Sequence, residues 1–84
     1  MAYTVLIAPS ARRDLKRVRG AARRPVADVI DDLASNPRPH GSAKLEGADD
    51  LYRIRVGDYR IIYRIEDDRL IVLVVRIGHR KEFA

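Results

Sequence analysis

Hydrophobic and polar positions follow two different periods along the chain. Residues 3–7 are mostly β-branched, aromatic or aliphatic and stop before Pro9, which predicts an opening strand at or near the edge of a sheet. From Ser10, a suitable N-cap, apolar residues recur at helical spacing until Gly20. This second pattern predicts a short amphipathic helix with a basic outer side.

A second helix and a long loop are predicted next. Pro25 suits a first helical turn, and the apolar stripe that begins at Val26 ends at Asn36-Pro37. The two predicted helices therefore form a hairpin. Residues 37–50 contain two prolines and two glycines among polar residues, which predicts a long loop.

The last third of the chain alternates with a period of two, which is typical of strands. Residues 51–56 and 59–65 alternate on either side of the Gly-Asp pair at 57–58, which predicts a β-hairpin with a two-residue turn. Residues 66–69 predict a second turn, and the nearly unbroken aliphatic run 70–77 is typical of an inner strand. The sequence thus predicts an α+β fold, in which an N-terminal strand, a helical hairpin and a three-stranded antiparallel meander form one sheet packed on the helices.

Length and composition indicate a single globular domain, residues 1–84. The chain is 46% hydrophobic and 35% charged, which favours one folded core over disorder. Without cysteine, and with only His40 and His79, it can build neither a disulfide framework nor a His/Cys metal cage, so we expect no metal or cofactor. It has no run of 18 apolar residues and no signal-peptide pattern, so we expect a cytoplasmic protein without a membrane partner.

Charge is unevenly distributed along the sequence. The formal net charge is +5, but residues 1–24 carry +6, residues 25–50 carry −4 and residues 51–84 carry +3. Cationic surface on so small a protein predicts a polyanionic partner, with nucleic acid first and an acidic protein second.

The predicted hairpin fixes which side chains share a face. If Val56 pairs with Tyr59, the tyrosines and Ile54 face the core, and the opposite face carries four arginines: Arg53, Arg55, Arg60 and Arg64. Like charges directly opposed across two strands destabilise a sheet by roughly 0.2–1 kcal/mol per pair. The arrangement therefore predicts an anion site, with phosphate favoured because guanidinium groups bind its oxygens in pairs. The alternative is that these side chains lie flat over Ile62 and Leu51, balanced by acidic residues.

Other basic residues are weaker candidates. Lys44 could reach a phosphate or pair with a nearby acid. His79 could act as a general acid or base, but a solvated residue is the alternative. Gly78 allows a bend, which leaves the face of His79 and Arg80 open. Lys81 extends the same basic end.

Three segments resemble a known family: Lys44 to Gly47, Tyr52 to Tyr63, and Gly78 to Glu82. They are similar to the RelE branch of the RelE/ParE toxin superfamily of bacterial toxin–antitoxin modules. The order of the predicted elements is similar as well. The resemblance implies a compact fold like that of small microbial ribonucleases.

The resemblance also implies a function, the toxin of a type II toxin–antitoxin module that cleaves messenger RNA in the ribosomal A site. Attack by the substrate 2′-OH on its own phosphate would leave a 2′,3′-cyclic phosphate and a 5′-hydroxyl, without a metal. The implied catalytic residues are Arg53, Arg55, Arg60 and Arg80, with His79 as a candidate for proton transfer. From their positions in the basic segments, and not from the resemblance, we predict Lys44, Arg64 and Lys81 as substrate-binding residues.

Two departures from the family pattern concern proton transfer. Members often have lysines where this sequence has Arg53 and Arg55, and arginine is a poor general base, so the base is unassigned. Many members place a tyrosine shortly after the Gly-His-Arg run, where this sequence has Phe83 and Ala84. The resemblance therefore implies either an attenuated enzyme or proton transfer by His79.

The implied partners are the ribosome, messenger RNA and a cognate, RelB-like antitoxin that folds on binding, in a toxin–antitoxin hetero-oligomer. An alternative is a ParE-like toxin that inhibits DNA gyrase without nuclease activity. A third is a degenerate member that only binds its antitoxin.

Overall fold

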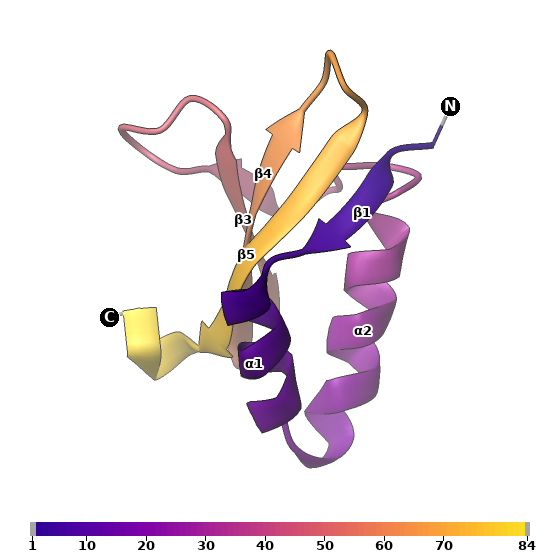
Figure 1. Ribbon diagram of the computed structural model, residues 1–84. Helices are drawn as coiled ribbons and strands as arrows, with labels where there is room; N and C mark the ends of the chain where they lie inside the picture. The colour runs from indigo at the N-terminus through magenta and orange to yellow at the C-terminus, as the bar shows by residue number, and fades with distance from the viewer. Residues whose placement is uncertain (1, 84) are drawn as a thin grey trace.

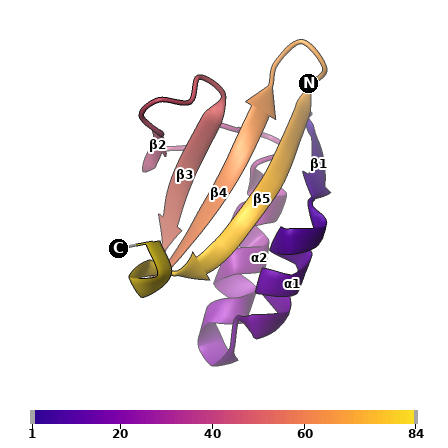
Figure 2. The same ribbon diagram turned by 60° about the vertical axis from the view of Figure 1, so that its left-hand side comes forward.

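The computed structural model describes residues 2–83, apart from the side chain of Phe83, as a five-stranded sheet with both helices on one side (Figure 1). The elements are β1 (Thr4–Ile7), α1 (Pro9–Arg17), η1 (Gly20–Ala22), α2 (Arg23–Asp32), β2 (Ser42–Lys44), β3 (Leu51–Val56), β4 (Tyr59–Glu66), β5 (Ile71–His79) and η2 (Arg80–Phe83). The strand order is β1-β5-β4-β3-β2, which Figure 2 shows side by side. β1 runs parallel to β5 and the other neighbours are antiparallel, so the predicted α+β architecture is confirmed.

The hairpin register is the predicted one, with Val56 opposite Tyr59 and Arg55 opposite Arg60. It turns one side of β3 and β4 towards the helices, where Tyr63 is fully buried and donates its hydroxyl hydrogen to the Pro37 carbonyl oxygen at 2.9 Å. The core consists of buried apolar side chains from both layers: Ala11, Val18, Val26, Ile30, Leu33, Ile54, Ile61, Tyr63, Ile65, Val72, Val74 and Ile77. No helix in the described part of the chain is long and apolar enough to cross a membrane.

Two details of the predicted elements are wrong. Ser10 is not the N-cap, because Ala8 is, and α1 begins at Pro9, two residues before the start that a Ser10 cap would give. The missing N–H of Pro9 has no helical partner to lose at that position. The predicted loop 37–50 contains the short edge strand β2, which pairs with β3. Three residues are too few to show the alternation of a strand, which is why the sequence did not predict β2. The strand forms by pairing with the edge of β3.

Helix α1 completes the edge of β5 beyond the point where β1 ends. Ser10 donates its hydroxyl hydrogen to the Val75 carbonyl oxygen at 2.8 Å. Four residues on, the Asp14 carboxylate accepts the Ile77 N–H at 2.9 Å. Asp14 is only 7% exposed. These two side chains bind backbone groups of β5 that a neighbouring strand would otherwise bind.

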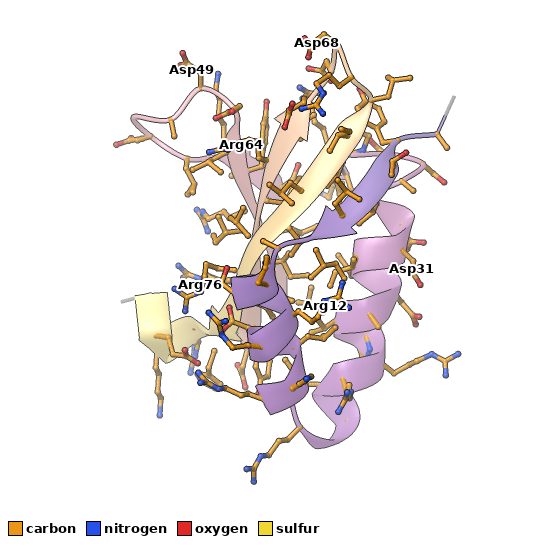
Figure 3. All side chains as sticks on the ribbon, viewed as in Figure 1. Arg12, Asp31, Asp49, Arg64, Asp68 and Arg76 are labelled. Carbon is orange, nitrogen blue, oxygen red and sulfur yellow. The ribbon has the colours of Figure 1, made fainter. Side chains whose placement is uncertain are left out.

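Replacing Asp14 by alanine should therefore lower the free energy of unfolding by about 2–3 kcal/mol. The substitution leaves the buried Ile77 N–H without its acceptor and Arg76 without its partner, since Arg76 Nε donates to the same Asp14 oxygen at 2.8 Å. Urea unfolding would measure the change. Asp31→Ala is the control, because Asp31 lies exposed on α2 (Figure 3) and its loss should cost less than about 0.5 kcal/mol. Equal losses in the two variants would contradict the role of Asp14.

A second polar cluster joins the loop after α2 to the turn between β4 and β5. Arg38 donates to both carboxylate oxygens of Asp67, at 3.1 and 2.8 Å, and Tyr3 donates its hydroxyl hydrogen to the same carboxylate at 2.6 Å. Arg38 Nε also donates to the Tyr52 hydroxyl oxygen at 3.2 Å. The hydrogen bond from Arg38, followed by that from Tyr3, lowers the pKa of Asp67 from 3.8 to about 2.

This shift predicts a specific acid sensitivity. Because the pKa of Asp67 is lower in the folded chain, its ionised form stabilises the fold above about pH 4, and that contribution is lost as the pH falls to about 2. Asp67→Asn should therefore show a weaker dependence of the urea midpoint on pH between pH 2 and 6 than the parent. Asp68→Asn, at the exposed neighbouring position, should leave the dependence unchanged, and a parental pH curve in Asp67→Asn would contradict the prediction.

Candidate nucleic-acid interface

Arginines line the face of the sheet that points away from the helices. On this face, directly paired residues of β3, β4 and β5 form three rows across the strands. The rows are Arg55, Arg60 and Gly78; Arg53, Ile62 and Arg76; and Leu51, Arg64 and Leu73. We call the side chains of Arg53, Arg55, Arg60, Arg64 and Arg76 the arginine face. Helices α1 and α2 both lie on the other side of the sheet (Figure 1), so neither of them covers this face.

The central arginines of this face have no internal counter-charge. Within residues 2–83, Arg53, Arg55 and Arg60 form no ion pair, although Arg55 and Arg60 are directly opposite each other. Arg60 Nε is shielded from solvent and has no hydrogen-bond partner. A shielded donor without an acceptor costs on the order of 1–3 kcal/mol, and more when charged. An anion bound between Arg55 and Arg60 would relieve the repulsion between the two guanidinium groups.

Two other arginines of the face, Arg64 on β4 and Arg76 on β5, do have acidic partners. Both arginines are labelled in Figure 3. Arg64 Nε lies 3.0 Å from an Asp50 carboxylate oxygen, but its N–H is not directed for a hydrogen bond. Arg76 is bound to Asp14. The alternative in which acidic residues balance the arginines thus applies at the edges of the face and not at its centre.

Two predicted site residues lie on the other side of the sheet. His79 is paired with Tyr59, and the two rings meet edge to face with their centres 5.6 Å apart. Lys44 is paired with Tyr52 in the unpredicted strand β2. Because directly opposed residues share a face, both follow the tyrosines towards the helix side. The structure therefore does not bring His79 or Lys44 together with the arginines.

The remaining predicted residues belong to η2. The Arg80 backbone N–H donates to the Asp58 carbonyl oxygen at 2.7 Å, and Arg80 Nε lies 3.8 Å from the Asp58 carboxylate. Since Asp58 is in the turn between β3 and β4, this contact places Arg80 at the same end of the sheet as Arg60. Lys81 follows Arg80 in η2 and is exposed. Ala84 and the side chain of Phe83, which stand where many members of the resembled family have a tyrosine, lie outside the described residues.

Comparisons with known proteins agree with the fold. A sequence profile described as the ParE toxin of type II toxin–antitoxin systems (parDE) matches residues 5–82. The chain belongs to this toxin family.

Its relatives in the family carry RelE-type names. Toxin RelG of Mycobacterium tuberculosis is 31% identical over 83 residues, covering 98% of this chain and 95% of the relative. The mRNA interferase toxin RelE of Escherichia coli is 25% identical over 83 residues, covering 96% of this chain and 86% of the relative. The archaeal RelE–RelB complex from Pyrococcus horikoshii has a chain with a TM-score of 0.83 and 32% identity, covering 95% of this chain and 97% of that one. The chain is therefore a RelE-type toxin.

One arginine of the face in this RelE-type toxin, Arg76, was not predicted as a site residue from the sequence. The pairing of β4 with β5 shifts by one residue between Ile62 and Tyr63, so that Val75 is an extra residue on β5. Beyond this bulge the alternation is reversed, which turns Arg76 outwards and buries Ile77. The available signal was Arg76 itself, the one charge within the aliphatic run 70–77.

Proposed function

We propose that this RelE-type toxin is an endoribonuclease that cleaves messenger RNA in the ribosomal A site and needs no metal ion. The supporting observation is the opposed pair Arg55 and Arg60, which has no internal counter-charge and includes a shielded, unpartnered Nε. The name of the Escherichia coli relative, an mRNA interferase, supports RNA as the anion.

The chemistry we propose uses the RNA as its own nucleophile. The 2′-hydroxyl loses its proton to solvent as its oxygen attacks the adjacent phosphorus, a pentavalent phosphorane with additional negative charge forms, and the bond to the 5′-oxygen breaks. A 2′,3′-cyclic phosphate remains on one product, and the leaving 5′-oxygen takes up a proton. The protein has to orient the sugar and phosphate and stabilise the developing charge.

Fixed guanidinium groups suit the second task, because they stay protonated and bind two phosphate oxygens at once. We assign charge stabilisation to Arg60 and Arg80, and phosphate binding to Arg53 and Arg55. Arg64 and Lys81 extend the cationic surface along the RNA. We assign no general base, since arginine does not give up its proton at neutral pH.

The direct test is primer extension on messenger RNA from ribosomes translating in the presence of the purified toxin. We expect new 5′ ends within the A-site codon, and 3′ ends that carry a cyclic phosphate. Ribosome-free RNA is the control and should be cut far more slowly. Intact messenger RNA on translating ribosomes would contradict the proposal.

The second candidate function is inhibition of DNA gyrase, because the matching family profile is described by its ParE toxins. A supercoiling assay with purified gyrase separates the two. We expect supercoiling to continue at toxin concentrations that stop translation. Inhibited supercoiling with intact messenger RNA would favour the gyrase function instead.

We also propose a cognate antitoxin as the partner, in a hetero-oligomer. Solved structures of relatives include RelE–RelB complexes, among them the archaeal one. A net charge of +5 favours an acidic partner whose binding weakens with added salt. Affinity capture of the tagged toxin, co-expressed with its neighbouring reading frame, should recover that second protein, and recovery of the toxin alone would contradict the partnership.

A further inference from the structure

The arginine face contains two cationic positions in succession along the strands. Arg55 and Arg60 form the first, and Arg53 lies two residues before Arg55 on β3. Two residues along a strand advance by about 6.6–6.8 Å. This step is similar to the separation of successive phosphates in an extended single-stranded nucleic acid, so the spacing suits two neighbouring phosphates of one RNA strand.

The second position is framed by Arg53 and Arg76, which flank Ile62 in one row across the sheet. Since β3 and β5 each neighbour β4, the two arginine backbones are separated by about 9.5 Å. Ile62 is only partly buried. Arginine stems can cover such an apolar side chain while the charged ends remain in solvent. Because Asp14 holds Arg76 Nε at the edge of β5 that faces away from β4, a phosphate between the two guanidinium groups requires Arg53 to extend across Ile62.

Asp14 holds the Arg76 side chain in place. The hydrogen bond of 2.8 Å occupies Arg76 Nε, and the same Asp14 oxygen is fixed by the Ile77 N–H. The Arg76 side chain remains 49% exposed, and within residues 2–83 its terminal Nη atoms form no hydrogen bond. A side chain that is already fixed loses less conformational entropy when it binds a ligand.

We propose that Arg53 and Arg76 form a second phosphate subsite, which binds the RNA phosphate adjacent to the one between Arg55 and Arg60. Asp14 is a positioning residue that acts through Arg76. This inference rests on the proposed function, because it takes the phosphate between Arg55 and Arg60 to be the one that is attacked.

The test measures how strongly the toxin binds RNA when each phosphate of the RNA is neutralised in turn. The probe is a fluorescent RNA oligonucleotide that cannot be cleaved because every 2′-hydroxyl is methylated, and each phosphate in turn is replaced by an uncharged methylphosphonate. We expect two adjacent replacements to weaken binding about tenfold each, as for a lost hydrogen bond between charged groups. Arg76→Gln should remove the penalty at one position, and Arg55→Gln should remove it at the other.

Arg24→Gln is the matched control, because Arg24 is an exposed arginine that also has an acidic partner, Asp28, at 3.4 Å. It lies on α2, off the arginine face, so both penalties should persist. Arg76→Lys keeps the charge and should retain part of the second penalty. A single sensitive phosphate in the parent, or an unchanged second penalty in Arg76→Gln, would overturn the subsite.

Asp14→Asn tests the positioning role and keeps an acceptor for the Ile77 N–H. It should weaken binding about threefold in the parent and not at all in Arg76→Gln, a coupling that a purely structural role would not produce. Tighter binding in Asp14→Asn would show that Asp14 merely neutralises Arg76, and would overturn its positioning role.

The subsite and the nuclease activity can fail separately. Two sensitive phosphates without cleavage on ribosomes would refute the proposed function and leave the subsite. Cleavage on ribosomes with only one sensitive phosphate would refute the subsite and leave the proposed function. If the free oligonucleotide does not bind, the same scan is made on the cleavage rate of ribosome-bound messenger RNA, where an effect of Arg76→Gln confined to one neighbouring phosphate is again required.

Discussion

Replacing Arg60 by alanine should lower kcat/KM for A-site cleavage by about 10²–10³-fold, the usual cost of removing one fixed donor to a transition-state oxyanion. Arg60 is opposite Arg55 at the centre of the arginine face, and its Nε is already shielded from water without a partner. The substitution removes a donor that gains most as charge develops on the phosphate. Rates come from primer extension under single-turnover conditions, and circular dichroism checks the fold.

Arg69→Ala is the matched control for this prediction. Arg69 is an exposed arginine in the turn between β4 and β5, and it is paired with Glu66 at 2.9 Å. Its removal makes the same change in net charge at a distance from the arginine face, so cleavage should stay within about twofold of the parent. Equal losses in Arg60→Ala and Arg69→Ala would mean that net charge matters and that the geometry of the face does not.

Arg55→Glu should stabilise the fold while it abolishes cleavage. The parent places two guanidinium groups directly opposite each other, which costs about 0.2–1 kcal/mol, and a glutamate would convert the repulsion into an attraction of similar size. A net gain of about 1 kcal/mol raises the melting temperature of a domain of this size by about 4–8 °C. Thermal unfolding and the ribosome assay measure the two effects in one protein.

Arg55→Gln shows how much of the stability gained in Arg55→Glu comes from the lost repulsion with Arg60 and how much from the new attraction. It removes the like charge without adding an opposite one, so its melting temperature should lie between those of the parent and Arg55→Glu. A melting temperature of Arg55→Glu at or below the parental value would show that the opposed arginines are not in conflict, and the case for an anion between them would be lost.

The hairpin and its faces could be predicted because local signals determine them. A two-residue turn fixes the register of β3 and β4, and the period of two then assigns each side chain to a face. That is why Arg53, Arg55, Arg60 and Arg64 were grouped correctly from the sequence. The missed features depend on contacts between distant segments.

Strand β2 and the outward direction of Arg76 are two such features. β2 is a strand because the edge of β3 is available to it, and Ser-Ala-Lys itself shows no alternation. Arg76 points outwards because one extra residue, Val75, reverses the alternation of β5. A bulge of this kind leaves no pattern in a run of valines and isoleucines, whose side chains fit either face.

The position of Asp14 in the sequence could have predicted that its carboxylate binds another element. It falls three residues after Ala11 and one before Leu15, within the apolar stripe of the first helix. An ionised carboxylate at a buried helix position needs donors nearby, so its position alone implied a partner on another element. The identity of that partner, the edge of β5 with Arg76, required the fold.

The mutual repulsion at the centre of the arginine face also links occupancy to the lifetime of the molecule. A polyanion that binds only the folded chain adds to its stability in proportion to the logarithm of its concentration. Proteases act on the unfolded fraction, so molecules with nothing bound are degraded first. We therefore expect a protease to degrade the free toxin faster than toxin to which a polyanion is bound.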